Sequence, residues 1–395
     1  MRKICWMALT AVLALLAACS TPYQTPVLST NGAGETRFKG LADLFGPEQT
    51  LDVLLVHGMC THGARWAHAA VQSLSSLLGG SATAVQLQAV PVAGTDIVLH
   101  QQTLLTAQGR LRANAIVWSP LTAPLKAQLC YDQTNKSAHC PPDEAAKAYP
   151  YQRATLNRLL KDRLLDDCLA DALIYQGRSR DRINQQMQQA ILQAVATSGG
   201  AAPAAQTTLA AAAAAVPGSQ PLVVLTESLG SKVAFDALVK LSRNAQTAAA
   251  GDQIWRRIAQ IFMAANQLPM LALADSELGD NLLAVKSEDA ASYPTDPIGA
   301  LMRGAQAKHL PGMQMTKVPD VIAFTDPNDL LSYLLSPSPH AVALGYPVVD
   351  VVVSNANTYL GVLEMPTTAH AGYLSNRAVR NLIACGHPKR AACGD

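Results

Sequence analysis

The sequence predicts an α/β fold with a mostly parallel central sheet and helices on both faces. Short continuous apolar segments occur near residues 51–56, 222–225, 261–264, 321–324 and 348–353, and such segments are typical of strands that are covered on both faces. Helical periodicity follows several of them. With 49% hydrophobic and 15% charged residues in 395, the composition indicates a globular body with a large core.

After the strand at 51–56, the first part of the chain predicts three further strands, one near residues 85–89 and two in a hairpin. The segment LDVLLV at 51–56 is the first confident strand, and HGMCTHG ends it. Val85, Leu87 and Ala89 alternate with polar residues, which predicts a second strand. The stretch from Gln102 to Trp118 predicts a hairpin that turns at Gln108-Gly109.

The middle of the chain predicts an insertion. Residues 119–171 are rich in proline, cysteine and charge, with a helical stretch near 151–169, and we expect an inserted helical cap there. Ile183, Met187, Ile191 and Val195 recur every four residues, as on a helix packed against a sheet. The Ala-rich segment 197–218 indicates either a frayed helix or a flexible loop.

The last part of the chain alternates strands and helices. A helix after the strand at 222–225 has its inner face at Leu229, Val233, Ala237, Leu238 and Leu241, and a final helix is expected at 376–383. This alternation is what predicts parallel strands.

The amino terminus predicts export. Arg2 and Lys3 precede an apolar run from Ile4 to Ala18, which is shorter than the roughly 20 residues of a membrane-spanning helix. The end of this run, Leu16-Ala17-Ala18-Cys19, resembles the bacterial lipobox, which implies a signal peptide at 1–18 and a lipid on Cys19. Ser20 in place of Asp implies the outer membrane, on its periplasmic or surface face. The alternative is an ordinary cleaved signal.

A tether is expected at 19–48, followed by one domain at 49–395. Residues 21–46 are rich in proline, glycine and threonine and show no apolar period. The net charge of +2 and the lack of a basic tract argue against a nucleic-acid partner.

Six cysteines remain after Cys5 and Cys19. An even number in an exported chain favours disulfides. Cys130 with Cys140 and Cys385 with Cys393 would close short loops, which leaves Cys60 for Cys168. Other pairings, or free buried thiols, are the alternatives.

The segment PLVVLTESLGSK at 221–232 places Ser228 between a strand and a helix. Thr226-Glu227-Ser228-Leu229-Gly230 resembles the GxSxG nucleophile elbow of the α/β-hydrolase family, which implies that Ser228 is a nucleophile. Thr226 departs from the motif and suggests a wider turn. The alternative role of Ser228 is a helix cap.

His57-Gly58 follows the first confident strand, where this family has its oxyanion loop. The resemblance implies that the backbone amides of Met59 and Leu229 would hold the substrate oxygen. His57 itself is expected to be structural. If Cys60 pairs with Cys168, the disulfide would fix this loop to the cap.

A serine nucleophile also needs a base and an acid. The segment VIAFTDPNDLLSY contains Asp326 and Asp329. The resemblance favours Asp329 as the acid, whereas Asp326 would open the turn before Pro327. His370 lies between the last strand and the last helix, and the order Ser228, Asp329, His370 matches that of the family. Asn266, Gln267 and Pro269 follow the strand at 261–264 and would lie on the same rim of the sheet as Ser228. They would either line the pocket or shape a loop.

These features predict a lipid-anchored serine hydrolase of the esterase or lipase type, acting on a small or lipid ester. The mechanism needs no metal and no organic cofactor, and the histidines show no zinc-site spacing. An acyltransferase with the same residues is one alternative. A non-catalytic envelope lipoprotein that binds ligands in the groove is the other, and Thr226 favours it.

Overall fold

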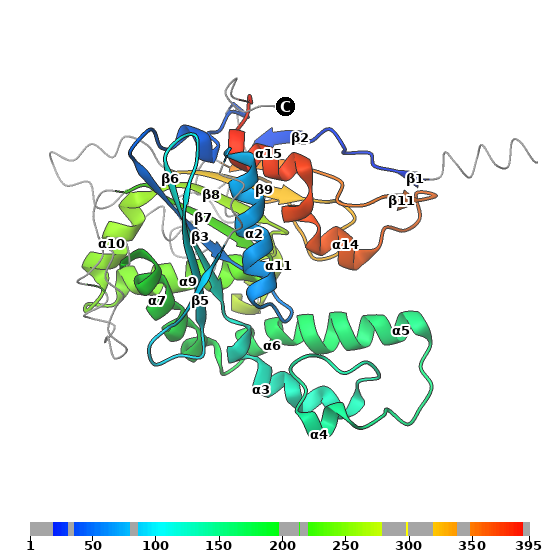
Figure 1. The fold of residues 1–395 in the computed structure, drawn as a ribbon. Coiled ribbons are helices and arrows are strands. Elements are labelled where there is room, and N and C mark those ends of the chain that lie inside the picture. Colours follow the sequence, from blue (N-terminus) through cyan, green and yellow to red (C-terminus); the bar gives the residue numbers. More distant parts are fainter. Residues whose placement is uncertain are drawn as a thin grey trace, which may run out of the picture.

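A nine-stranded mixed sheet forms the centre of the protein (Figure 1). The computed structural model describes residues 19–30, 35–79, 86–196, 213, 220–278, 298, 319–337 and 348–389. The strands of this sheet are β2 (Val27–Thr30), β3 (Thr50–Val56), β4 (Gln88–Pro91), β5 (Val98–Leu105), β6 (Arg110–Val117), β7 (Leu222–Glu227), β8 (Ile258–Ala264), β9 (Asp320–Thr325) and β10 (Val348–Val352).

The strand order is β2-β10-β9-β8-β7-β3-β6-β5-β4. The six neighbouring strands from β10 to β6 are parallel, whereas β2, β5 and β4 pair in the antiparallel sense at the two edges. The predicted α/β class with a mostly parallel sheet is therefore confirmed.

Helices cover both faces of the sheet and bury alternate side chains of each strand. Leu54 and Val56 of β3 pack in the cluster that includes α7 (Arg180–Ala196), α9 (Leu229–Arg243) and α10 (Ala248–Arg257). Val53 and Leu55 pack on the other side with α2 (Ala64–Leu77) and α15 (Arg377–Cys385). Burial on both sides explains why the central strands are apolar without interruption.

Two covering helices were not predicted from the sequence. In α2, Ala67, Val71 and Leu74 are buried at spacings of four and three, which is the signal that a periodicity search could have found. In α10, Ile254 and Trp255 are buried next to charged residues, and the apolar stripe is too short to be distinctive.

The expectation of a tether over 19–48 is wrong for much of that segment. Val27–Thr30 forms β2, which pairs with β10 at one edge of the sheet. Leu41 begins a short 3₁₀ helix, η1 (Leu41–Asp43), and is fully buried, as Phe45 nearly is. Phe38, Leu41 and Phe45, at spacings of three and four, join the core cluster on the face of the sheet that α15 covers, although the surrounding composition looks like that of a linker.

The predicted hairpin is present as β5 and β6. Its turn contains Gln108-Gly109, where the Thr106 amide donates to the Gly109 carbonyl over 2.8 Å. The strand expected around Val85 to Ala89 begins later, at Gln88, and Val85 lies outside the described residues. The Ala-rich segment 197–218, apart from Ala213, the expected signal peptide and Cys393 also lie outside them.

The insertion after β6 is helical and projects from the body of the sheet (Figure 1). It contains η2 (Ser119–Leu121), α3 (Ala123–Lys126), η3 (Ala127–Asp132), α4 (Pro142–Ala145), α5 (Thr155–Leu159), the π-helical segment η4 (Leu160–Leu169) and α6 (Ala170–Gln176). The elements α5, η4 and α6 join end to end. The helix that was expected to end at Leu169 therefore continues to Gln176, beyond the predicted boundary of the cap at 171. Ala170 and Ala172 continue the buried side of the helix across that boundary.

The six parallel strands all end at the same edge of the sheet. Residues that follow them include His57 after β3, Ser228 after β7 and Asp326 after β9. After β10 the chain passes through β11 (Thr358–Tyr359) to α14 (Pro366–Ala371) and the 3₁₀ helix η9 (Tyr373–Ser375). In open parallel sheets ligand sites are found at this edge.

Candidate active site

Ser228 occupies a strained turn between β7 and α9. Its backbone has φ 52° and ψ −129°, in the half of conformational space that bulky residues rarely adopt. The Ser228 amide donates to the Ala264 carbonyl over 2.8 Å, and its own carbonyl accepts from the Ser231 amide over 3.1 Å. Strain of this kind persists only where the surroundings hold it, and it is concentrated at functional sites.

Two glycines allow the turn and the loop after β3 to pack together. A β-carbon on Gly230 would lie 2.3 Å from the His57 carbonyl oxygen. A β-carbon on Gly58 would lie 2.6 Å from the β-carbon of Ser228. Any side chain at either position would therefore force the two segments apart.

Thr226 is fully buried at the end of β7 and has a partner for its hydroxyl. Its Oγ1 forms a hydrogen bond of 2.8 Å with the Ser231 hydroxyl, which is also buried. The residue that departs from the elbow motif is therefore accommodated by a contact to the first turn of α9, because a satisfied hydroxyl can be buried at little cost.

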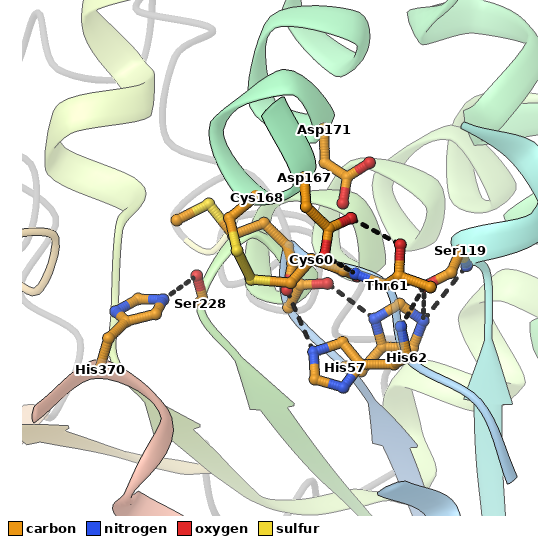
Figure 2. Close-up of a disulfide and its surroundings, with 12 residues drawn as sticks. His57, Cys60, Thr61, His62, Ser119, Asp167, Cys168, Asp171, Ser228 and His370 are labelled. Carbon is orange, nitrogen blue, oxygen red and sulfur yellow. Dashed lines mark hydrogen bonds between the residues drawn. A yellow bond between two sulfur atoms is a disulfide. The ribbon is translucent and has the colours of Figure 1, made fainter. Parts of the chain in front are cut away.

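The side chains of Ser228, His370 and Asp329 form one hydrogen-bonded chain. His370 comes from α14, and its Nε2 lies 3.0 Å from the Ser228 hydroxyl (Figure 2). Its Nδ1 lies 2.9 Å and 3.0 Å from the two carboxylate oxygens of Asp329. The Asp329 side chain is fully buried and that of His370 is 13% exposed. The three residues expected to meet do so, with the imidazole between an acid and a hydroxyl.

Asp326 has a different position from Asp329. Its carboxylate accepts from the Asn328 amide over 2.9 Å and from the Asn355 amide over 2.6 Å. Its carbonyl accepts from the Asp329 amide, closing the turn after β9. Asp326 thus opens the turn, as expected, and Asp329 contacts the imidazole.

Tyr373 is a site residue that sequence reasoning missed. Its hydroxyl donates to Asp329 over 2.9 Å and accepts from the Asp326 amide over 2.8 Å. Burial raises the pKa of Tyr373 well above its ordinary value, so the phenol remains a donor. Tyr373 follows His370 by three residues, but nothing in that spacing indicates that its hydroxyl reaches across to the loop after β9.

His57 is buried and neutral. Its Nε2 accepts from the Trp118 amide over 3.0 Å, and its Nδ1 lies 2.7 Å from the Gly58 carbonyl. Nε2 is thus the acceptor and Nδ1 the donor. Burial, followed by the nearby His62, lowers the pKa of His57 well below its usual range. The ring stacks on Trp118, with centroids 5.1 Å apart. His57 supports the loop and does not touch Ser228 through any of these contacts.

A disulfide joins the loop after β3 to the cap. Cys60 pairs with Cys168 of η4, across 108 residues of sequence (Figure 2). Cys130 pairs with Cys140 inside the cap. Both pairings are those favoured by the sequence. Cys385 is also disulfide-bonded, and its expected partner lies outside the described residues.

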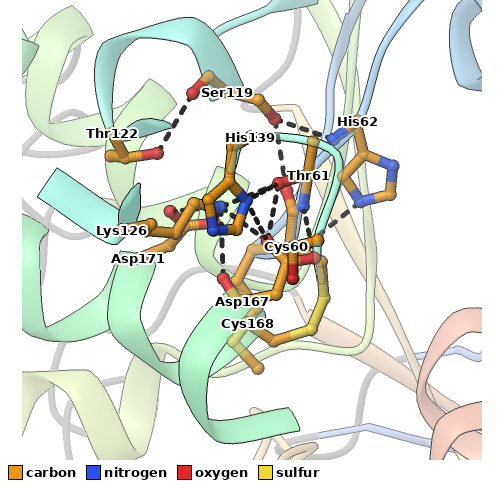
Figure 3. Close-up of polar contacts among 12 residues, drawn as sticks. Cys60, Thr61, His62, Ser119, Thr122, Lys126, His139, Asp167, Cys168 and Asp171 are labelled. Atoms are coloured by element: carbon orange, nitrogen blue, oxygen red, sulfur yellow. Dashed lines mark hydrogen bonds and ion pairs between the residues drawn. A yellow bond between two sulfur atoms is a disulfide. The ribbon is translucent and has the colours of Figure 1, made fainter. Parts of the chain in front are cut away.

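A buried ion-pair network reinforces the same junction (Figure 3). The fully buried Lys126 ammonium lies 2.8 Å from Asp167 and 3.1 Å from Asp171. Asp167 accepts from both the amide and the hydroxyl of Thr61, over 3.1 Å and 2.6 Å. The ion pairs lie within the cap, and the hydrogen bonds of Thr61 to Asp167 and to Lys126 link this network to the loop after β3.

A cavity of about 660 Å³ lies between the cap and the side of the site that carries Asp329 and His370. One wall comes from the cap, with Leu164, Leu165 and Leu169, and includes the Cys60–Cys168 disulfide. The other wall includes Leu330, Leu331, Asp329 and His370. This volume suits a small organic ligand or part of a lipid, and the walls are mainly apolar.

The rim residues after β8 have different roles. Asn266 shapes a loop, because its side-chain oxygen accepts from the Leu268 amide and its carbonyl from the Tyr333 amide. Gln267 is buried and contacts the sulfur of Met59 over 3.9 Å. Pro269 lines a separate hollow of about 470 Å³ with Tyr333.

The described residues contain one group with potential metal ligands close together, Cys130, His139 and Cys140. Both sulfur atoms belong to the disulfide. As bonded here, the group offers no thiolate, which is the form that binds zinc.

Glu227, next to Ser228, accepts a hydrogen bond from the Trp66 indole over 2.5 Å. Burial raises the pKa of Glu227 to about 7, against smaller lowering effects of Trp66 and His370. Between about pH 4.5 and about pH 7, Glu227 is therefore protonated to a greater extent in the folded state than in the unfolded chain. The free energy of unfolding should fall as pH rises through this window and level off above it.

Glu227→Gln is expected to reduce this fall in the free energy of unfolding between low and neutral pH by about 1–3 kcal/mol. Glu364 keeps its own contribution, since its pKa is also raised to about 7, by burial first and by Asp326 second. Urea unfolding from about pH 5 to about pH 8 measures the difference. Glu35→Gln, which alters an exposed ion pair with Arg37, should leave the slope unchanged. A parallel pH dependence of wild type and Glu227→Gln would contradict the assignment.

Cys19 and Ser20 form β1 (Cys19–Ser20), a two-residue strand paired with β11. The part of the chain that the structure describes contains no helix with the length and hydropathy needed to cross a bilayer.

Comparisons with models of known protein families, with curated proteins and with solved structures gave no match.

Proposed function

We propose that this protein is a serine hydrolase with an α/β-hydrolase fold that cleaves carboxylic esters. The observation that carries the proposal is the hydrogen-bonded chain from Asp329 through His370 to the Ser228 hydroxyl, at the carboxyl edge of a parallel sheet. A hydroxyl is a weak nucleophile in water, and a base within hydrogen-bond reach is what activates it.

In the proposed reaction the Ser228 oxygen attacks the ester carbonyl while His370 Nε2 takes the hydroxyl proton. Asp329 holds Nδ1–H, which leaves Nε2 free to accept, and it stabilises the imidazolium that forms. His370 then returns the proton to the leaving alcohol, giving an acyl-serine. Water, deprotonated by the same imidazole, releases the acid and regenerates Ser228.

The tetrahedral intermediate needs donors for its oxygen. Leu229 is the first residue of α9, so its amide has no carbonyl to bond within the helix, and the helix dipole favours negative charge there. The Met59 amide follows Gly58, which packs against Ser228. We assign both amides to the oxyanion hole. An acyltransferase would use the same residues with a different acceptor.

Export and lipid attachment at Cys19 remain part of the proposal, and they rest on the segment Leu16 to Cys19. They would place the enzyme on the outer membrane, with a small or lipid ester as substrate. Mass spectrometry of the protein extracted from membranes would test this, through an amino-terminal peptide that begins at Cys19 and carries acyl chains.

A fluorophosphonate probe tests the catalytic part of the proposal, because it reacts only with an activated serine. Wild type should be labelled and Ser228→Ala should not. Ser231 is a poor control since its hydroxyl bonds Thr226. The better matched control is Ser73→Ala, on the exposed side of α2, which should label like wild type. Folded wild type without labelling would favour the non-catalytic binding protein.

A further inference from the structure

A short segment between β11 and α14 exposes an unusual number of large apolar side chains. We call residues 359–365 the apolar turn. The exposed fractions are 54% for Tyr359, 65% for Leu360, 84% for Val362, 53% for Leu363 and 40% for Met365. Single exposed apolar residues are common, but a contiguous group is typical of a surface that binds something.

The backbone of the apolar turn is strained at its tip. Leu360 and Gly361 have φ values of 54° and 66°, and the Val362 amide donates to the Tyr359 carbonyl over 2.9 Å. Such a tight turn favours glycine or asparagine at its two central positions. The chain has leucine instead at the first, where it is both strained and exposed to water. Two unfavourable features at one residue indicate a role other than stability.

The start of the described chain is held against the same turn. Cys19 pairs with Tyr359 and Ser20 with Thr358 in the β1–β11 ladder. The contact continues where the Tyr23 amide donates to the Ser354 hydroxyl over 3.1 Å. In the sequence the apolar run from Ile4 to Ala18 ends immediately before Cys19. A lipid on Cys19, as proposed above, would place the point of attachment beside the apolar turn.

The apolar turn also leads directly into the site. Met365 precedes α14, which carries His370 and whose Pro366 and Thr367 line the cavity. The ribbon shows β1, β11, α14 and the α5 end of the cap on the same side of the molecule (Figure 1). A flat surface that touches the apolar turn would therefore lie on the side of α14 and the cap.

We propose that the apolar turn docks the protein on a lipid bilayer, with Leu360 and Val362 in the interfacial layer. The apolar tip would be removed from water there, as are the apolar faces of other proteins that lie on membranes. Docking would orient the cavity toward the lipid in addition to any tether at the amino terminus. The inference does not depend on hydrolysis and holds for a binding protein as well.

Tryptophan fluorescence in vesicles tests the proposal. The full chain carrying Val362→Trp is reconstituted with vesicles of phosphatidylethanolamine and phosphatidylglycerol, with and without bromine on the acyl chains. The emission added to that of the native tryptophans should shift to the blue and be quenched by the brominated lipid. The matched control is Leu105→Trp. Leu105 is 72% exposed and pairs with Arg110 at the opposite edge of the sheet, so its added emission should be unaffected.

Equal quenching of the two added tryptophans, or quenching of neither, would overturn the proposal, because no defined face would then meet the lipid. Should Val362→Trp fail to fold, Leu363→Trp probes the same exposed turn. Near-ultraviolet circular dichroism checks the fold of each variant. Fluorophosphonate labelling of the same samples separates failure of docking from failure of the proposed function.

Discussion

Asp329→Asn should lower kcat on a short aryl ester by a factor on the order of 10⁴. Asp329 accepts from Nδ1–H of His370 in the tautomer that leaves Nε2 facing Ser228. An asparagine amide can donate to Nδ1 instead, which would put the proton on Nε2 and block its action as a base. Binding depends less on this proton, so KM should change little.

Asp326→Asn is the matched control, three residues away in the same loop. Asp326 accepts from the backbone amides of Asn328 and Asn355. The variant should lose about 1–3 kcal/mol of stability but less than about tenfold in kcat, which corresponds to about 1.4 kcal/mol at the transition state. If Asp326→Asn lost activity and Asp329→Asn retained it, the assignment of the acid would be wrong. Chemical denaturation of both variants separates the two effects.

Gly58→Ala should reduce kcat by a factor of about 10²–10³, the loss seen when an oxyanion donor is removed. The added β-carbon would lie 2.6 Å from the β-carbon of Ser228 and 2.9 Å from the Glu227 carbonyl oxygen. Since backbone and β-carbons cannot give way locally, the loop after β3 must move, and the Met59 amide moves with it. Labelling by the fluorophosphonate should slow in parallel.

Gly63→Ala, in the same loop region, is the control for Gly58→Ala. A β-carbon on Gly63 would meet no atom within 4 Å, so kcat should be close to that of wild type. Thermal unfolding shows whether Gly58→Ala is folded at the assay temperature. An unchanged kcat in folded Gly58→Ala would remove the loop after β3 from the proposed oxyanion hole.

Much of the site could be predicted because its residues follow strand ends. The apolar segments at 222–225 and 321–324 indicated strands, and parallel strands bring their carboxyl ends to one edge. Ser228 and Asp329 were therefore expected at the same edge, and the strand order, with only β8 between β7 and β9, brings them close. The same reliance on apolar segments made the prediction of a tether wrong. The strand β2 is short and only half apolar, and it forms because it pairs with β10 at an edge of the sheet.

Contacts between distant side chains could not be predicted in the same way. The hydroxyl of Tyr373 reaches Asp329, 44 residues earlier, and the Trp66 indole reaches Glu227, 161 residues later. Each contact depends on how a helix packs on the sheet, and neither residue belongs to a local pattern. The pKa of Glu227 is raised by the same packing, which removes its carboxylate from water.

By itself the sequence determined the α/β class, the strands that end at the site and the order of the three side chains, because hydrophobic period and turn residues act within a few positions along the chain. Only the tertiary structure decided that Asp329 contacts His370 while the Asp326 carboxylate accepts from backbone amides of its own turn and of Asn355. It also decided that the Thr226 hydroxyl bonds Ser231 and that the apolar turn lies beside Cys19. Those outcomes depend on distances of about 3 Å between segments far apart in the chain, which are set when the helices and the cap pack on the sheet.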